Sequence, residues 1–418
     1  MRGWLVCSGL FVLTILTLSC GNNSSLVPAQ PSISSQPSAP PTPTPTPSSP
    51  PPASEASQTF VYVVIGHVGV HGTDELPSLT GLMFKDEHLT LIPTPQFPGL
   101  FLGVYPIEVA VSPRSKLLYV VDKLALSSSS WKLRIFRILD DGNLSEVSSN
   151  FQLQYTESPM AVTPNGKFLF IPAYDGLHEY RIEQGTDLPT ELAGSPFSVG
   201  DIRLASTAVI DPSGKYLYVS RLTNGIWGFA LNSETGRLTD LPKNPLASGF
   251  GAVTAIEPSG HFLYVHLNSS NPSTQYQIYA IASDGELEKL GTLDSTVSLW
   301  RTVFDPLSHA GYLTPAVPGG ELEVVRVNSG DGRLQRIPGS PFSFAALSND
   351  GLPCNVYDRT VDTTQRLLYA SACSQYIVVA RLGDDSLPQP QLADRLKIAS
   401  GDSTGYSSLA GRIAIAVR

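Results

Sequence analysis

Cysteine and charge are both scarce in this chain. Four cysteines occur among 418 residues, charged residues make up 15% of the sequence, and the formal net charge is −9 at pH 7. No stretch of the sequence gathers basic residues into a run. An acidic chain without a basic patch lacks the electrostatic surface that binds nucleic acid or anionic lipid. We therefore expect no nucleic-acid partner.

The N-terminus lacks an apolar run long enough to cross a membrane. The stretch from Trp4 to Leu18 follows a single basic residue, Arg2, and is shorter than the about 20 residues that a helical span needs. It ends in small residues and a cysteine. This pattern is typical of an export signal that is removed from the mature protein, predicted here over residues 1–20.

The end of this segment, Thr17-Leu18-Ser19-Cys20, resembles a bacterial lipobox, in which the cysteine becomes the lipid-modified first residue of the mature chain. We expect lipidation at Cys20, a membrane anchor, and a location in the cell envelope, either periplasmic or surface-exposed. Ordinary secretion with cleavage nearby is the alternative.

Residues 21–59 consist mostly of serine, proline and threonine, including a PTPTPTP stretch, with Glu55 as the only charge. Such a composition cannot bury a core, and proline favours an extended spacer of about 3.1 Å per residue. We interpret this segment as a linker between the membrane and a folded domain at residues 60–418.

A short phrase recurs along that domain: a small or acidic residue, usually a proline, a turn, and then a strand with the pattern of LLYV or FLYV. The aromatic residues at the strand centres are Tyr62, Tyr119, Phe170, Tyr218, Tyr264, Tyr312 and Tyr369. Their spacings of 57, 51, 48, 46, 48 and 57 residues fit four short strands with their turns. The sequence therefore predicts an all-β, seven-bladed β-propeller with little helix.

The two ends of the domain predict how the ring closes. The strand Phe60–Val64 corresponds to the second strand of a blade, and nothing ahead of it supplies the first. The apolar segment Arg412–Val417 has no partner of its own. We expect it to complete the first blade, so that pairing of the terminal strands leaves no long open edge. We also expect the domain to be a monomer.

Two cysteines remain in the folded part, Cys354 in the loop leading into the last blade and Cys373 after that blade's second strand. Exported proteins retain disulfides, and both residues are predicted at the same end of the ring. We expect a disulfide between them; a metal-binding pair without further ligands and two buried free thiols are the alternatives. We expect no metal and no cofactor.

The repeats, the recurring Gly-x-Leu turns and two GSPF segments (Gly194–Phe197 and Gly339–Phe342) resemble the seven-bladed lactonase family. That family includes 6-phosphogluconolactonases of the propeller type and carboxymuconate cyclases. The resemblance covers Phe60–Arg418 and implies the propeller fold together with lactone hydrolysis.

The family's functional positions can be compared one by one. Met160 follows Pro159 where active members have a Pro-His pair, and Thr302 follows Arg301 where they have Arg-His. Pro315-Ala316 occupies the place of an Asn-Glu pair. Met, Thr, Pro and Ala cannot act as the proton acceptor that lactone hydrolysis needs. We therefore expect a module that binds a ligand or a protein, and the alternative is a hydrolase with a rearranged site in which Arg301 is the catalytic candidate.

Aromatic and arginine side chains are predicted in the loops at one end of the ring, where they suit recognition of a polar small molecule or a protein. The alternative for each is a loop anchor or a solvated charge. The ligand-binding candidates are Trp300, Arg301, Arg203, Tyr105, Asp122 and His266.

Overall fold

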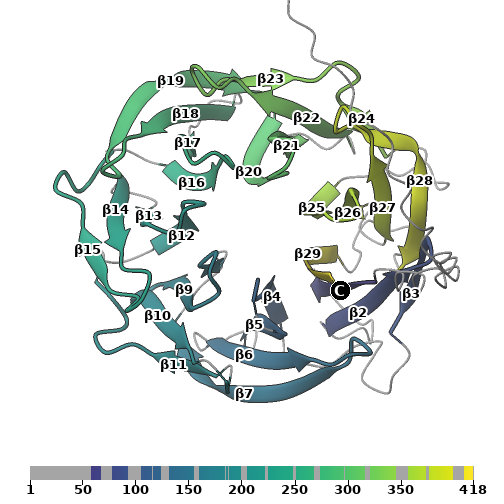
Figure 1. The fold of residues 1–418 in the computed structure, drawn as a ribbon, viewed down its shortest axis with the longest axis horizontal. Helices are drawn as coiled ribbons and strands as arrows, with labels where there is room; N and C mark the ends of the chain where they lie inside the picture. Colours follow the sequence, from purple (N-terminus) through teal and green to yellow (C-terminus); the bar gives the residue numbers. More distant parts are fainter. Residues whose placement is uncertain are drawn as a thin grey trace, which may run out of the picture. The chain divides into compact units, whose positions relative to one another are not determined.

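The seven predicted repeats form seven antiparallel sheets placed around a common axis (Figure 1). The compact unit that holds them comprises Ser54–Arg418. The computed structural model describes residues 58–66, 78–92, 105–114, 116–123, 131–154, 160–183, 185–186, 188–198, 205–221, 225–247, 251–267, 274–295, 297–315, 321–344, 356–372, 376–398 and 409–417. Within these ranges the chain forms strands and turns, and none of it is a helix that could span a membrane.

Each sheet is one blade of four strands, and all seven blades share the same order from the axis outward. The innermost strands are β29 (Leu409–Val417), β4 (Tyr105–Val111), β8 (Ala161–Val162), β12 (Ala205–Ile210), β16 (Gly251–Ile256), β20 (Val297–Phe304) and β25 (Val356–Asp362). The second strands are β1 (Thr59–Gly66), β5 (Leu117–Lys123), β9 (Phe168–Ala173), β13 (Tyr216–Arg221), β17 (Phe262–Leu267), β21 (Ala310–Pro315) and β26 (Leu367–Ala372).

The third strands are β2 (Ser78–Lys85), β6 (Trp131–Ile138), β10 (Gly176–Ile182), β14 (Gly225–Leu231), β18 (Thr274–Ile281), β22 (Glu321–Val327) and β27 (Tyr376–Leu382). The outermost strands are β3 (His88–Leu91), β7 (Leu144–Leu153), β11 (Pro189–Glu191), β15 (Leu238–Asp240), β19 (Leu287–Ser295), β23 (Leu334–Arg336) and β28 (Pro388–Lys397). A further short strand, β24 (Phe342–Ser343), also pairs with β22. The prediction of a seven-bladed propeller is confirmed.

The ring closes through the two ends of the chain, as predicted. The C-terminal strand β29 pairs antiparallel with β1, from Val417 opposite Thr59 to Leu409 opposite Gly66. Both strands are longer than the sequence indicated: β1 begins one residue before Phe60, and β29 begins three residues before Arg412. In blade one, therefore, the innermost strand comes from the C-terminus and the other three from the N-terminal part of the domain.

The polar residue that opens each repeated phrase holds the turn between the first and second strands. In blade four, Oδ1 of Asp211 accepts a hydrogen bond of 2.6 Å from the backbone N–H of Tyr216, and Oδ2 accepts one from the N–H of Ser213. Glu257 and Asp362 make the same kind of bonds in their turns. Asp362 keeps this role without the proline that follows the polar residue in the other copies, because the carboxylate itself satisfies the turn's donors.

The aromatic anchors of the second strands connect each blade to the next. The Tyr218 hydroxyl donates to the carbonyl of Gly285 at 2.9 Å, and Gly285 lies in the turn between the third and fourth strands of the following blade. Three other anchors make the equivalent bond: Tyr62 to Gly142, Tyr264 to Gly332, and Tyr312 to Ser386. The Leu-Tyr-Val strands and the Gly-x-Leu turns of the sequence are thus the two halves of one joint between blades.

Glycine in these turns is required for two reasons. Gly285 has a φ of +85°, which disfavours other residues, and a Cβ added to it would lie 2.5 Å from the Tyr216 ring of the preceding blade. Gly142 packs equally closely on Phe60, and Gly332 on Phe262. In these three joints the aromatic residue two positions before the anchor therefore covers the turn whose carbonyl the anchor's hydroxyl binds.

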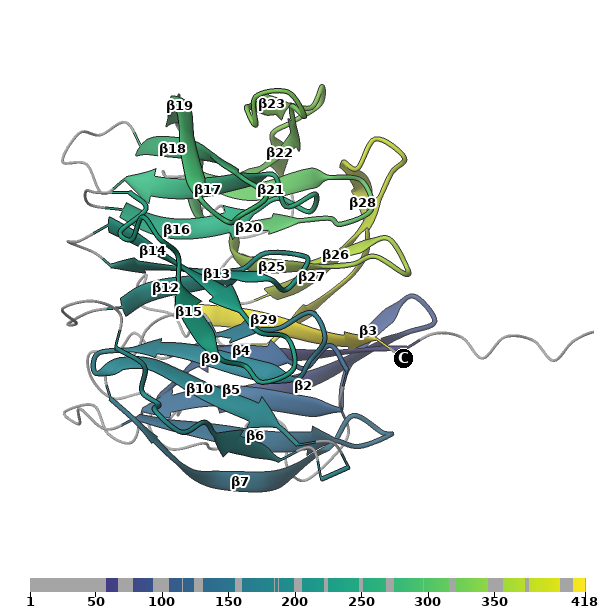
Figure 2. The ribbon, with the colours of Figure 1, turned by 60° about the vertical axis from the view of Figure 1, so that its left-hand side comes forward.

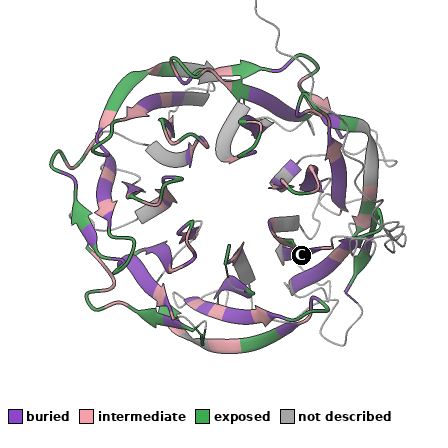
Figure 3. Cartoon of the chain, in the orientation of Figure 1, coloured by how far each residue is buried: buried purple, intermediate pink, exposed green. Residues whose placement is uncertain are grey.

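The two GSPF segments also have a structural role. The Ser195 hydroxyl accepts the backbone N–H of Glu179 at 3.0 Å, and the Ser340 hydroxyl accepts that of Val324 at 2.8 Å. In both blades the segment folds back from the outermost strand onto the third strand and satisfies a donor there. Buried residues lie mainly in the middle strands of each blade, whereas exposed ones lie on the outer rim and turns (Figure 3).

We predict that Tyr218→Phe destabilises the domain by about 1–2 kcal/mol, because the Gly285 carbonyl then stays buried without its donor. Burial raises the pKa of the Tyr218 hydroxyl, so this group remains a protonated donor at ordinary pH. Chemical denaturation of the purified protein measures the loss.

The matched control is Tyr174→Phe, which removes a hydroxyl from an exposed tyrosine outside the joints. It should leave the unfolding midpoint unchanged. Equal effects of the two substitutions would show that the bond between blades contributes nothing.

Candidate functional site

Six of the seven innermost strands contain an irregularity in their pairing with the second strand. In β4, β12, β16 and β25, two residues advance along the inner strand while the second strand advances by one, for example from Pro106 to Glu108 against Asp122 to Val121. The closing strand β29 has the same irregularity between Ala410 and Ile413. Bulges of this kind redirect side chains and are common beside binding sites.

The largest irregularity lies in β20. Between Ser298 and Val303 the inner strand advances five residues, whereas β21 advances two, from Thr314 to Tyr312. Three extra residues therefore leave the ladder, compared with one in the other bulges. The excursion contains Trp300 and Arg301, so the backbone of both candidates lies in the middle of β20, between the paired residues at its two ends.

Charged residues occupy only part of this ring of inner strands. Strands β8, β12 and β16 contain none, whereas the four consecutive inner strands β20, β25, β29 and β4 carry several at or beside their bulges. We call this set the charged arc; it consists of Arg301, Asp358, Arg359, Arg412 and Glu108. The strand β29 lies beside β25 on one flank and β4 on the other, so closure of the ring makes the arc continuous (Figure 2).

The described side chains of the charged arc hold the closing strand from both sides. The Arg412 Nε lies 3.5 Å from the Glu108 carboxylate of blade two. On the other flank, Oδ2 of Asp358 accepts the backbone N–H of Ile413 at 3.0 Å. Glu108 and Asp358 are both buried, and buried charges are costly unless they are paired.

Arg359 extends the arc toward blade six. Its side chain is buried, and its Nε donates to the Tyr312 carbonyl at 2.9 Å. A residue of the second strand of blade six is thereby fixed against the inner strand of blade seven. The arc therefore consists of a buried framework around the place where the ends of the chain meet.

The predicted candidates fall into three groups. Tyr105, Trp300 and Arg301 lie within inner strands rather than in the loops before them, because β4 and β20 begin earlier than the sequence indicated. Asp122 and His266 lie in the second strands β5 and β17. Outside the described residues lie Arg203, Cys20, Cys354 and Cys373, so lipidation and the disulfide stay predictions.

Asp122 belongs to the framework of blade two. Its side chain is fully buried, with Oδ2 3.8 Å from the Arg134 guanidinium of the neighbouring strand β6. Arg134 in turn donates to both oxygens of Glu146. A carboxylate held in this way is a structural element of the blade rather than the loop ligand that the sequence suggested.

His266 retains features of a binding residue. Its ring centroid lies 5.4 Å from that of Tyr276, and burial lowers the pKa of the imidazole, so the neutral form dominates at neutral pH. Its strand β17 belongs to blade five, however, whose inner strand β16 carries no charge. The structure therefore does not bring His266 into the charged arc.

Met160 and Thr302 stand where the resemblance places functional histidines. Met160 packs against the apolar cluster between blades two and three, which includes Tyr180 and Leu169. Thr302 lies inside the β20 bulge. The part of the chain that the structure describes contains no group of three His, Cys, Asp or Glu side chains placed to hold a metal ion.

Comparison with known proteins supports the resemblance. Residues 179–299 match the family described as "Lactonase, 7-bladed beta-propeller", so the matched segment runs from β10 to the bulge of β20. The chain is similar to the seven-bladed β-propeller lactonases, as predicted. Met160 and Arg301 lie outside the matched segment. No curated protein sequence matches the chain.

Solved structures with the same fold come from several bacteria. A protein of Lactobacillus plantarum has 13% identity and a TM-score of 0.59, over 87% of this chain and 99% of that one. A candidate 6-phosphogluconolactonase of Bacteroides uniformis has 14% identity and a TM-score of 0.57, over 87% and 100%. The periplasmic gluconolactonase of Pseudomonas aeruginosa has 13% identity and a TM-score of 0.55, over 86% and 98%. At these identities the likeness establishes the fold.

Proposed function

We propose that this protein is an envelope-anchored propeller that binds a ligand or a protein segment at the charged arc and does not hydrolyse lactones. The observation that carries the proposal is that the positions of the family's acid–base residues hold side chains that cannot take part in proton transfer. The family's histidine positions hold Met160 and Thr302, and Met160 packs into an apolar joint. Neither side chain can accept a proton.

The carboxylates of the charged arc do not replace those histidines. Asp358 accepts a backbone N–H of the closing strand, and Glu108 faces the Arg412 guanidinium. Both therefore hold the ring together rather than stand ready as bases. The Arg412 side chain, by contrast, is 24% exposed, so it can offer a polar partner charge-assisted hydrogen bonds.

The second candidate is a hydrolase with a rearranged site. It is favoured by the bulge that contains Arg301 and by solved relatives described as a candidate 6-phosphogluconolactonase and as a periplasmic gluconolactonase. In such a site Arg301 would polarise the lactone carbonyl, and a water molecule would be the nucleophile.

A hydrolysis assay with glucono-δ-lactone and 6-phosphogluconolactone as probes separates the two candidates. We expect the purified protein to open neither lactone faster than buffer does, and Arg301→Ala to change nothing. Turnover that Arg301→Ala abolishes would overturn the binding proposal. The matched control is Arg326→Ala, which removes an exposed arginine from the third strand of the same blade.

The anchor is a separate part of the proposal, supported by the lipobox-like Thr17–Cys20 and by the proline-rich segment that follows. In a bacterial host fed an alkyne-bearing fatty acid, the full chain should acquire the label and sediment with membranes. Cys20→Ala should lose both properties, because the acylated thiol is then absent. Cys7→Ala, within the predicted signal, is the control and should keep them; label that persists in Cys20→Ala would contradict lipidation at this residue.

A further inference from the structure

The joint between blades three and four differs from the other joints. Phe170 occupies the anchor position of blade three, where four other blades use a tyrosine hydroxyl to reach the next turn. The corresponding turn of blade four still packs closely, since a Cβ on Gly236 would lie 2.5 Å from the Phe168 ring. This joint therefore keeps the packing of an aromatic ring on the turn glycine, but it lacks the hydroxyl of the anchor residue.

A carboxyl group is buried at the same place. Glu179 of β10 stands directly opposite Phe170 in the ladder with β9. In the other blades the residues opposite the anchors cannot ionise; they are Gly81, Ile135, Gly228, Ile278, Val324 and Val379. Glu179 is 6% exposed, and its Oε1 has no hydrogen-bond partner among the described residues.

The surroundings of this carboxyl are mostly apolar. Side chains alternate along a strand, so Leu177 and Arg181 share the face of β10 that carries Glu179. Leu177 belongs to the cluster that packs blade three on blade four, together with Phe170 and Phe229. The Glu179 side chain thus lies in the joint itself rather than on the solvent-facing rim.

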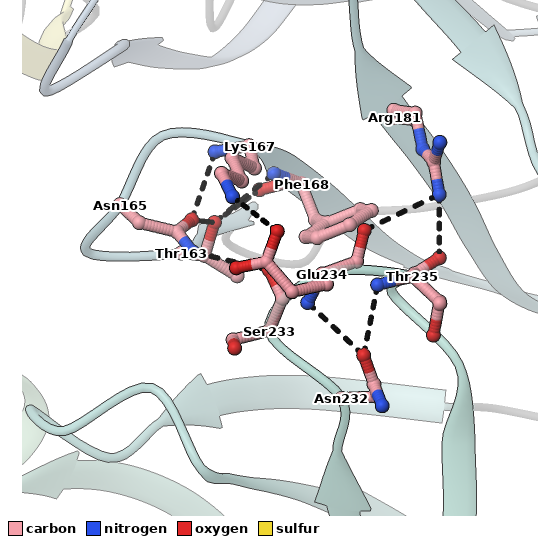
Figure 4. A network of polar contacts seen from close by, with 9 residues as sticks. All are labelled: Thr163, Asn165, Lys167, Phe168, Arg181, Asn232, Ser233, Glu234 and Thr235. Carbon is pink, nitrogen blue, oxygen red and sulfur yellow. Dashed lines mark hydrogen bonds and ion pairs between the residues drawn. The ribbon is translucent and has the colours of Figure 1, made fainter.

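The charged groups around the joint are engaged elsewhere. Arg181 donates to the carbonyls of Glu234 and Thr235, and Lys167 pairs with the Glu234 carboxylate at 2.7 Å (Figure 4). On the neighbouring strands, Glu191 of β11 binds His178 and Ser195, and Asp240 of β15 binds Asn244. The facing strand β14 carries no charge, and Lys215, before β13, forms no ion pair among the described residues.

We propose that the joint between blades three and four is a proton-controlled seam, closed while the Glu179 carboxyl is neutral and loosened when it ionises. An ionised carboxylate in this position has no cation of its own, so it can be hydrated only if the two blades separate locally. The polar contacts on the rim, which do not involve Glu179, would keep the ring intact while the inner part of the seam opens.

The direction of the effect follows from the burial of the group. Burial raises the pKa of Glu179 from its ordinary 4.5 to about 7. Between these values the folded protein retains a proton that the unfolded chain releases, so stability is greatest at the acid end and falls as pH rises toward 7. The difference of about 2.5 pH units sets an upper limit of a ~300-fold change in the folding equilibrium.

Native-state hydrogen exchange of the full protein at pH 6 and pH 8, corrected for the intrinsic exchange rate, tests the seam. We expect the amides of β10 and of the turn 232–236 to lose protection at pH 8, and those of the tyrosine-anchored joints to keep it. Glu179→Gln should remove this difference and flatten the dependence of the denaturation midpoint on pH between 5 and 8. Glu234→Gln, which removes only the rim ion pair with Lys167, should retain the wild-type dependence.

Protection of β10 that does not change with pH in the wild type would overturn the proposal. So would a pH dependence that persists in Glu179→Gln or disappears in Glu234→Gln. Should Glu179→Gln fail to fold, the wild-type exchange at the two pH values still decides, because the seam and the other joints are compared within one molecule.

Discussion

The structure depends on one contact that is repeated between blades: a tyrosine hydroxyl from the second strand of one blade donates to a turn carbonyl of the next. Four joints contain it, and in three of them a glycine at positive φ lets the turn pack against an aromatic ring. A blade alone could not bury its sheet faces, so each blade needs its neighbour. The repeat in the sequence is therefore a repeat of joints as much as of strands.

Closure of the ring adds a second constraint and creates the candidate site. The closing strand β29 has a carboxylate from the blade on each flank, Asp358 on one and Glu108 on the other. The charged arc exists only after the chain's last strand has taken its place. Binding at the arc would consequently favour the closed ring, because a ligand that prefers the folded state stabilises it. With the proposed function, stability and recognition would depend on the same few side chains.

The sequence predicted the fold far better than the site. The spacing of anchors such as Tyr218 and Tyr264 indicated seven blades, because a repeated blade leaves a regular spacing in the sequence. The terminal strands indicated closure, because nothing ahead of the first supplies its inner partner and the last has no partner nearby in the sequence. Glu108 and Arg412 meet only after closure, and no local pattern links residues so distant in the chain. The bulge around Arg301 also has no reliable sequence signature. Asp122 was assigned to a loop because the polar residue ends an apolar run, although β5 continues through it to Lys123.

The most direct test of this account is denaturation of a chain that ends at Ser408 and therefore lacks β29. This chain loses the partner of β1 and, with it, the Arg412 side chain that pairs with Glu108. If closure organises the ring, the truncated chain should show no cooperative unfolding transition at the wild-type midpoint. Retention of that midpoint and of the wild-type cooperativity would contradict the account, because the ring would then be stable without the strand that closes it.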